Sequence, residues 1–272
     1  MLKKLLKHEW VETWKIPTFM LVALLVITVL AGLGFSAPIW ESEMTGLTIL
    51  MILLWLVYYF ALIAVSIGIT IYLAYRFYKS MFTDEGYLTH TLPVTARQLL
   101  VSKILPMCAW SALASLAIIL SVFIFGAMAY MFLEPSANVS LAEFVQELQR
   151  AMKEVFGLEG GTNFVISLIA LMVVGVFSGT LTVTGSITIG QLVGKHKILG
   201  SIGAYFAIMI VMQTLSMMVM FPSMFRMTFT AEDNVFVVMA PMYYGISIIS
   251  LIIAVLLYIL SEFIVKRKLN LD

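Results

Sequence analysis

The chain has 272 residues, of which 62% are hydrophobic and only 11% are charged, and its formal net charge is +1. Soluble domains carry roughly a quarter charged residues, so this composition excludes an ordinary soluble domain and predicts an integral membrane protein. The single cysteine, Cys108, excludes an internal disulfide.

The first predicted element is an amphipathic helix over residues 2–15. Its apolar residues recur every four positions: Leu2, Leu6, Trp10 and Trp14. This spacing, with charged residues on the other faces, is typical of a helix lying on a membrane surface. A solvated, charged N-terminus is the alternative. The apolar run that follows is too long for a typical signal peptide, and Glu9 and Glu12 interrupt its basic flank, so we expect this segment to be retained.

Six segments contain no Asp, Glu, Lys, Arg or His, and each exceeds the roughly 18 residues that a membrane-spanning helix needs. They cover residues 17–35, 47–75, 104–133, 164–194, 198–222 and 235–261. A soluble helical core is the alternative, but buried soluble helices rarely extend past about 20 residues without a charge. The segments predict an all-α integral membrane protein with six transmembrane helices, in a single domain over residues 1–272.

The basic residues of the loops fall mostly on one side of the membrane. One set of alternate loops contains Lys3, Lys4, Lys7, Lys15, Arg76, Lys79, Arg97, Lys103, Lys195, Lys197, Lys266, Arg267 and Lys268. The other set contains only Arg150, Lys153 and Arg226. Because Lys and Arg are enriched in cytoplasmic loops, this asymmetry predicts that both termini are cytoplasmic.

A polar insert separates the second and third spans, within a predicted cytoplasmic segment over residues 76–103. Thr83 is a candidate N-cap for a short helix, and Asp84 and Glu85 suit the positive end of that helix. Pro93 would end it, and a capping box from Thr95 would open the third span. We predict a short helical stub between two long helices; an ordinary structured loop is the alternative.

A second amphipathic helix is predicted over residues 140–157, on the extracellular side. A capping box runs from Ser140 to Glu143, and Gly157 supplies the stop. One face is apolar: Leu141, Phe144, Val145, Leu148, Met152, Val155 and Phe156. Such a helix would lie over the bundle or on the outer leaflet; a disordered acidic loop is the alternative.

The fourth span is rich in glycine, serine and threonine, including Gly175, Gly179, Thr184 and Gly190. Small residues allow transmembrane helices to approach closely, and hydroxyls can form hydrogen bonds across the contact or line a water-filled path. We expect that these residues serve helix packing, and the water-filled path is the alternative. Only the sequence from Lys195 to Lys197 separates this span from the next, which predicts an antiparallel hairpin.

Catalytic and metal-binding patterns are missing from the sequence. The histidines, His8, His90 and His196, are far apart in the chain, and the spans offer no acid, base or metal ligand of the kind that intramembrane enzymes use. We expect neither a catalytic residue, a cofactor nor a metal in this chain. Spans without charge also argue against a proton-driven pump, although sodium coupling through carbonyls and hydroxyls remains possible.

The insert carries a resemblance to a known family. Residues 77–94, FYKSMFTDEGYLTHTLPV, followed by RQLLVSK at 97–103, resemble the first cytoplasmic loop of Firmicutes-type permease subunits of type-2 ATP-binding-cassette (ABC) exporters. The resemblance implies that this loop carries a coupling helix that docks in a groove of a separate ATPase subunit. It assigns that role to Asp84, Glu85, Gly86, Tyr87 and Leu88. It also implies that residues 2–14 form the connecting helix of such permeases.

The same resemblance implies that the second and fifth spans border a central substrate path. Its candidate lining residues are Tyr58, Tyr59, Ser66, Gln213, Thr214 and Ser216. Interhelical packing explains each of them equally well. One departure from the family lies in the extracellular helix, which stands between spans three and four, whereas many relatives elaborate the segment between spans five and six.

Together these features predict a non-catalytic permease subunit of a bacterial plasma-membrane exporter. Two copies, or one copy with a similar chain, would pair with two ATPase subunits, which bind the ATP and Mg²⁺. The apolar spans and the 19 methionines suit a hydrophobic or amphipathic peptide, lipid or drug; no nucleic-acid partner is expected. The alternatives are a membrane receptor or assembly scaffold that recruits a cytosolic protein, and a sodium-coupled secondary carrier.

Overall fold

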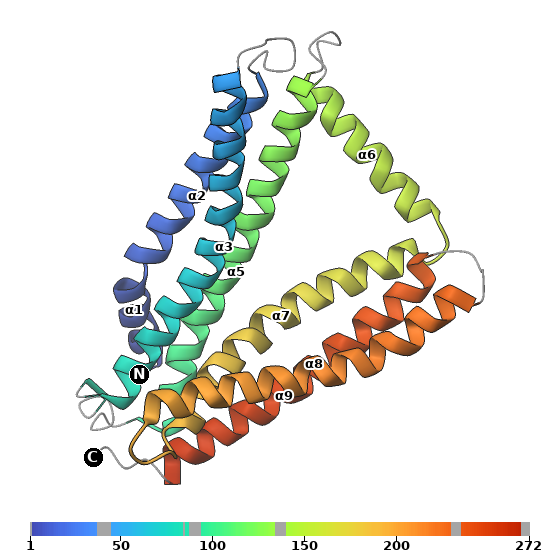
Figure 1. Cartoon of the computed structure of the whole chain (residues 1–272). Coiled ribbons are helices and arrows are strands. Elements are labelled where there is room, and N and C mark those ends of the chain that lie inside the picture. Colours follow the sequence, from blue (N-terminus) through green and yellow to red (C-terminus); the bar gives the residue numbers. More distant parts are fainter. Residues whose placement is uncertain are drawn as a thin grey trace. The chain divides into compact units, whose positions relative to one another are not determined.

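A computed structural model describes residues 2–36, 45–83, 85–86, 94–133, 140–229 and 235–267 of the chain (Figure 1). These residues form eight α-helices and one short 3₁₀ turn, with no strand among them. The elements are α1 (Leu2–Thr13), α2 (Lys15–Leu33), η1 (Gly34–Ser36), α3 (Thr45–Phe82), α5 (Ala96–Leu133), α6 (Leu141–Gly157), α7 (Gly161–Gly190), α8 (Lys197–Phe229) and α9 (Val235–Arg267). The predicted all-α fold is confirmed.

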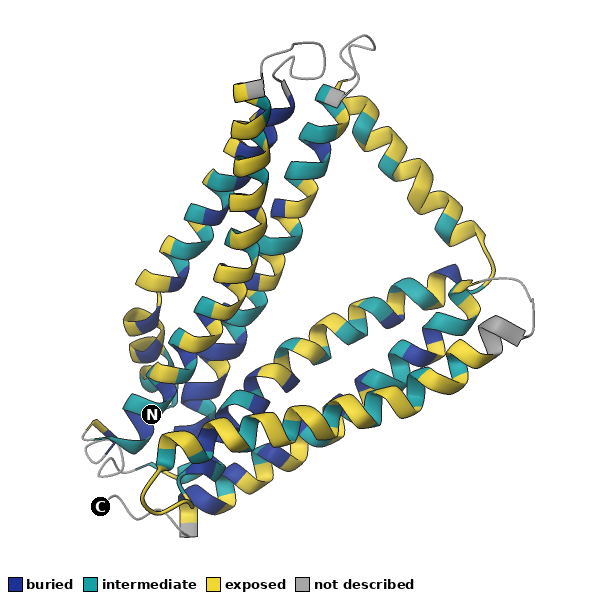
Figure 2. Ribbon diagram, viewed as in Figure 1, coloured by how far each residue is buried: buried dark blue, intermediate teal, exposed yellow. Residues whose placement is uncertain are grey.

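Six of these helices, α2, α3, α5, α7, α8 and α9, are long and apolar enough to cross a membrane. Few of their residues are buried: even in α9, only 33% of the most apolar stretch is buried, and in α8 none is (Figure 2). Large apolar side chains are exposed along all six helices. Large exposed apolar surfaces are unfavourable in water and normal in lipid. The chain is therefore a multi-pass membrane protein.

Two of the observed helices extend beyond the charge-free segments. The second span continues through Phe82, and the third begins at Ala96, directly after Thr95 of the predicted capping box. At 38 residues each, α3 and α5 are about 57 Å long at 1.5 Å per residue, whereas the hydrocarbon core is about 30 Å thick. Both helices must therefore project beyond the bilayer.

The N-terminal amphipathic helix is shorter than predicted, because α1 ends at Thr13 and α2 begins at Lys15. Pro17 explains this end. A proline has no N–H to donate to the carbonyl four residues earlier, which here belongs to Thr13, and proline is tolerated in the first turn of the helix that follows. Pro17 lies in that first turn of α2 and is fully buried.

The chain divides into two compact units, each with its own internal contacts. Unit 1 comprises residues 1–11, 73–109 and 154–272, and unit 2 comprises residues 12–72 and 110–153. Unit 1 thus contains α7, α8, α9, most of α1, and the ends of α3 and α5 that flank the polar insert. Unit 2 contains α2, most of α3 and α5, and most of α6.

A buried hydroxyl network holds the helices of unit 2 together. The Ser121 hydroxyl of α5 lies 2.8 Å from the Thr28 hydroxyl of α2 and 3.0 Å from the Tyr58 hydroxyl of α3. The Tyr58 ring stacks on Phe125, with ring centroids 4.5 Å apart, and Phe125 also meets the ring of Phe35. In lipid, hydrogen bonds of this kind contribute to helix association, so this network fixes how α2, α3 and α5 pack.

In unit 1, small residues allow α7 to approach its neighbours. A side chain at Gly190 would come within 2.4 Å of the Ser201 backbone nitrogen of α8, and one at Gly185 would meet Leu257 of α9 at 3.2 Å. The hydroxyls of Thr180, Thr184 and Thr188 donate to carbonyls of α7 itself, four residues earlier. These contacts favour the packing interpretation at Gly185 and Gly190, whereas a Cβ at Gly175 or Gly179 would meet nothing within 4 Å. α7 and α8 form the predicted hairpin.

Candidate functional site

The polar insert between α3 and α5 is the most distinctive segment of the sequence, and the structure describes its two flanks. Thr83, Glu85 and Gly86 follow α3, and Val94 and Thr95 precede α5. Asp84 and residues 87–93, which include the predicted coupling residues Tyr87 and Leu88 and the predicted helix breaker Pro93, lie outside the described residues. The described part of the site therefore consists of its two flanks.

The first residues of the insert fold back onto the end of α3. The Thr83 hydroxyl donates to the Lys79 carbonyl oxygen at 2.6 Å, and the Gly86 N–H donates to the Thr83 carbonyl oxygen at 2.7 Å. The Thr83 hydroxyl closes the last turn of α3, where backbone carbonyls lack helical donors. A hydroxyl that donates can also accept, so the predicted cap of the helix after Thr83 stays a prediction.

An ion pair adds a second tie between the insert and α3. The Lys79 Nζ lies 2.7 Å from the Glu85 Oε1, and both side chains are partly exposed. The hydrogen bond from Lys79 lowers the pKa of the Glu85 carboxyl below its ordinary value. Glu85, predicted as a docking residue, thus also holds the start of the insert in place.

Gly86 occupies a position that only glycine fits. It is buried, and a Cβ atom there would lie 2.5 Å from the Met81 carbonyl oxygen. A backbone oxygen at the end of a helix cannot rotate away as a flexible side chain can. The close approach at Gly86 is to the chain's own α3, and its docking to an ATPase stays a prediction.

The other flank of the insert begins α5 with the predicted capping box. The Gln98 N–H donates to the Thr95 hydroxyl, and the Thr95 N–H donates to the Gln98 side-chain oxygen, each at 3.3 Å. These reciprocal bonds satisfy two of the donors that a helix leaves free at its start. Leu99 and Leu100 follow in the next turn and are buried. Both ends of the insert are therefore joined to well-formed helices.

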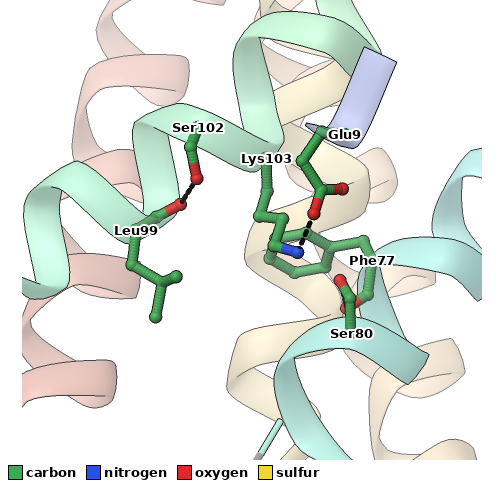
Figure 3. A network of polar contacts seen from close by, with 6 residues as sticks. All are labelled: Glu9, Phe77, Ser80, Leu99, Ser102 and Lys103. Atoms are coloured by element: carbon green, nitrogen blue, oxygen red, sulfur yellow. Dashed lines mark hydrogen bonds and ion pairs between the residues drawn. The ribbon is translucent and has the colours of Figure 1, made fainter. Parts of the chain in front are cut away.

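Below the insert, a buried ion pair connects α1 to α5. Lys103 of α5 donates to the Glu9 carboxylate of α1, and only 7% of Glu9 and 8% of Lys103 is exposed (Figure 3). Removing one partner of such a pair usually costs about 3–5 kcal/mol, because the other charge is left buried. The pair therefore fixes α1 against the start of α5.

The ion pair belongs to a compact group of buried side chains, which we call the base cluster. It consists of Glu9 of α1, Phe77 and Ser80 of α3, and Leu99, Ser102 and Lys103 of α5 (Figure 3). All six are buried, and the hydroxyls of Ser80 and Ser102 donate to helix carbonyls three residues earlier. Since α1 and both flanks of the insert contribute to it, the base cluster ties all three together.

The remaining faces of α1 agree with a helix at a membrane surface. Trp10, Val11 and Trp14 are exposed, at 39%, 55% and 45%, and tryptophan is enriched at membrane interfaces. Farther along the helix, the Trp110 indole N–H donates to the Thr13 hydroxyl at 3.2 Å. α1 therefore turns its polar Glu9 and Thr13 toward α5 and leaves its aromatic residues outward.

One group of potential metal ligands lies on α1 among the described residues. The ligand atoms of His8, Glu9 and Glu12 all lie within 4.8 Å of one another. The sequence interpretation did not identify this set, although its members, at i, i+1 and i+4 of one helix, form a local pattern. Glu9 is already paired with the ammonium group of Lys103, and a cation there would meet that positive charge. The group is better explained as part of the ion-paired surface of α1.

Comparisons with protein-family models, curated proteins and solved structures found no match to this chain.

The predicted path residues occupy different environments. Tyr58 is buried in the hydroxyl network of unit 2, whereas Tyr59 is 62% exposed and Ser66 is also exposed. On α8 in unit 1, Gln213 and Thr214 are exposed and Ser216 is half-buried. Tyr58 thus serves the packing of α2, α3 and α5, and the exposed residues keep the role of candidate path lining.

The base cluster was not foreseen from the sequence. Lys103 was counted only as a basic loop residue, and Glu9 only as an interruption of the basic N-terminus. One signal was available: on α1, Leu2, Leu5, Leu6, Glu9 and Thr13 recur at helical spacing. A glutamate on an otherwise inward-facing stripe suggests a buried cation as its partner, but the sequence does not say which of the basic residues this is.

Proposed function

We propose that this chain is the permease subunit of a bacterial ABC exporter, and that its polar insert receives the force of ATP hydrolysis from a separate ATPase subunit. The observation that carries the proposal is the attachment of the insert to α3 through Thr83, Glu85 and Gly86. An insert tied in this way passes a displacement to α3, instead of absorbing it as a loose loop would.

The base cluster supports the same role. It is buried and joins α1 to the flanks of the insert (Figure 3), and densely packed interiors transmit strain. A push on residues 84–88 would therefore move α1, α3 and α5 as a group. Charge-free spans offer no internal proton relay, which agrees with energy that enters from a partner.

In this proposal the insert and both termini lie in the cytoplasm, as the distribution of Lys and Arg favours, and the membrane is the bacterial plasma membrane. Two permease chains pair with two ATPase subunits that bind ATP and Mg²⁺. Substrates are hydrophobic or amphipathic peptides, drugs or lipids. Gln213 and Thr214, exposed on the least buried spanning helix, remain the best candidates for the path lining.

The first experiment asks whether an ATPase binds through the insert. The full-length chain is purified from its native membrane, and ATP-dependent substrate movement is measured in sealed vesicles. Wild-type protein should retain an ATPase subunit, and Tyr87→Ala with Leu88→Ala should lose both the subunit and transport. Retained ATPase with no transport of any peptide, drug or lipid would favour a scaffold. Transport driven by a sodium gradient without ATPase would favour a carrier.

Glu85 needs a separate control because it holds the insert as well as facing outward. Glu85→Lys breaks the ion pair with Lys79, whereas the exchange Lys79→Glu with Glu85→Lys restores a pair of reversed polarity. If the ATPase contacts the Glu85 carboxylate, both variants should lose the ATPase subunit. Recovery of ATPase binding in the exchange variant would show instead that Glu85 acts only by holding the turn.

A further inference from the structure

Helix α6 presents an apolar face that the described protein does not cover. None of its 17 residues is buried. Four residues of the apolar face are exposed by two-fifths or more: Leu141, Val145, Met152 and Phe156. Phe144, Leu148 and Val155 are half-buried. At 100° per residue these seven side chains span an arc of about 120°, as wide as the stripe that amphipathic helices normally bury.

Both ends of α6 are held close to the ends of membrane-spanning helices. At its start, Phe144 meets Tyr130 in the last part of α5, with ring centroids 5.5 Å apart. At its end, the Gly161 N–H that opens α7 donates to the Leu158 carbonyl oxygen at 3.0 Å. Phe164, in the first turn of α7, packs on Phe236 of α9 at 4.9 Å. The start of α6 therefore contacts the last part of α5, and its end leads directly into α7.

The order of the elements places α6 on one side of the membrane. α5 and α7 are both long and apolar enough to cross it, so the segment between them stays on the side where α5 ends and α7 begins. An amphipathic helix of 17 residues on that side suits the membrane surface. Three spanning helices, α2, α3 and α5, separate it from α1 along the chain, so this is the surface opposite α1.

The polar face of α6 suits a phospholipid surface. It carries three acidic and two basic residues, Glu143, Glu147, Glu154, Arg150 and Lys153. The Arg150 guanidinium bonds the Glu147 carboxylate at 2.6 Å, and both side chains are well exposed. Mixed charge of this kind can meet the phosphate and ammonium groups of lipid headgroups, while the apolar face enters the upper acyl region.

We propose that α6 is an interfacial helix whose apolar face is covered by the lipid of the membrane leaflet opposite α1. Lipid is favoured as the occupant because the uncovered face continues the exposed apolar surface of the span that precedes it, where Tyr130 is 40% exposed. This proposal is independent of ATP coupling.

Single labels on the full-length protein in phospholipid vesicles test the proposal. In a Cys108→Ala background, a cysteine replaces Met152 or Phe156 on the apolar face, or Gln146 on the polar face, and carries an environment-sensitive fluorophore. All three positions are exposed, so the fold should tolerate the changes. Doxyl-labelled phosphatidylcholine should quench the Met152 and Phe156 labels several-fold more strongly than the Gln146 label. Aqueous iodide should show the reverse order.

Two outcomes would overturn the proposal. If iodide quenches the Met152 and Phe156 labels as strongly as the Gln146 label, α6 lies in water. If those labels are protected from both quenchers, protein covers the apolar face, and dilution of the protein in lipid then separates a second copy from the rest of the same chain. The background variant without further cysteines measures any labelling elsewhere.

Discussion

The two amphipathic helices of this protein, α1 and α6, are held to the rest of the chain in different ways. α1 places Glu9 in a buried ion pair with Lys103, next to the flanks of the polar insert. α6 has no buried residue, and among the described residues it contacts the end of α5 near its start and leads into α7 at its end. Amphipathic pattern alone therefore does not distinguish a helix fixed to protein from one supported by lipid.

This difference suggests a division of roles. A helix that is fixed to the base cluster must move whenever α3 and α5 move, as expected of an element on the proposed path of energy. A helix that rests on lipid can shift along the surface without breaking protein contacts. The following predictions compare matched positions at the two surfaces.

The largest difference in stability is expected between two substitutions of lysine, one buried and one exposed. Lys103→Met leaves the Glu9 carboxylate buried without its partner, so stability should fall by about 3–5 kcal/mol. Lys153→Met, on the exposed face of α6, should change stability by no more than about 0.5 kcal/mol. Thermal unfolding in lipid nanodiscs measures both variants.

A double variant separates the ion pair from general damage at this position. Glu9→Gln combined with Lys103→Met removes both buried charges and should recover most of the loss. A double variant as unstable as Lys103→Met would show that the pair does not account for the effect. Equal losses in Lys103→Met and Lys153→Met would remove the contrast between the two helices.

Substitution of glycine by alanine should give the next largest difference in stability. A Cβ at Gly86 meets the Met81 carbonyl oxygen at 2.5 Å, whereas a Cβ at Gly157 finds nothing within 4 Å. Gly86→Ala should therefore cost about 1–3 kcal/mol, as forced overpacking does, and should release the start of the insert. Gly157→Ala should be neutral or slightly stabilising, since alanine favours helix. Faster proteolytic cleavage within residues 84–93 in Gly86→Ala alone would meet this expectation; similar cleavage in both variants would contradict it.

Much of the fold was predictable because its signals are local. Charge-free runs locate the six spanning helices, and short polar motifs locate the starts of α5 and α6, where both predicted capping boxes form. The end of α1 at Thr13 was also implied by Pro17 four residues later, although we did not use that signal. Each of these features depends only on residues within one or two helical turns.

The base cluster and the role of Tyr58 depend on partners distant in the chain. Glu9 and Lys103 are 94 residues apart, and Tyr58 and Ser121 are 63 apart. A single sequence contains no pairing information at such separations. Thr83 illustrates a different difficulty, since its hydroxyl can donate to the preceding helix, as it does to the Lys79 carbonyl oxygen, and can also accept from a following one. The sequence alone does not show which of these contacts forms.

A smaller effect is expected from the helix caps. Ser140→Ala removes the hydroxyl that accepts the Glu143 N–H, which should cost the start of α6 about 1 kcal/mol. Hydrogen exchange at residues 141–145 should accelerate accordingly. Thr95→Ala removes the matching cap of α5, but Leu99 and Leu100 in the next turn are buried, so exchange there should change less. Equal acceleration at both helices would mean that α6 is supported by more than its ends and its lipid surface.

The smallest effect concerns pH and the tie between Glu85 and α3. The hydrogen bond from Lys79 lowers the pKa of Glu85, so the folded turn favours the ionised carboxylate. Its contribution is complete above the unfolded pKa of about 4.3 and is lost as the pH falls through the lower folded value. Because the pair is partly exposed, the effect should be small and reduced further by salt.

Hydrogen exchange of the Gly86 amide, corrected for its intrinsic pH dependence, measures that loss. Protection should be constant near neutral pH and should weaken only in acid. In Glu85→Gln, protection should be lower at neutral pH and should not depend on pH. Glu147→Gln, which removes the exposed ion pair of α6, should leave Gly86 unchanged throughout. If Glu85→Gln retained the acid-dependent loss, a group other than Glu85 would be titrating, and the Lys79–Glu85 pair would not account for the pH dependence.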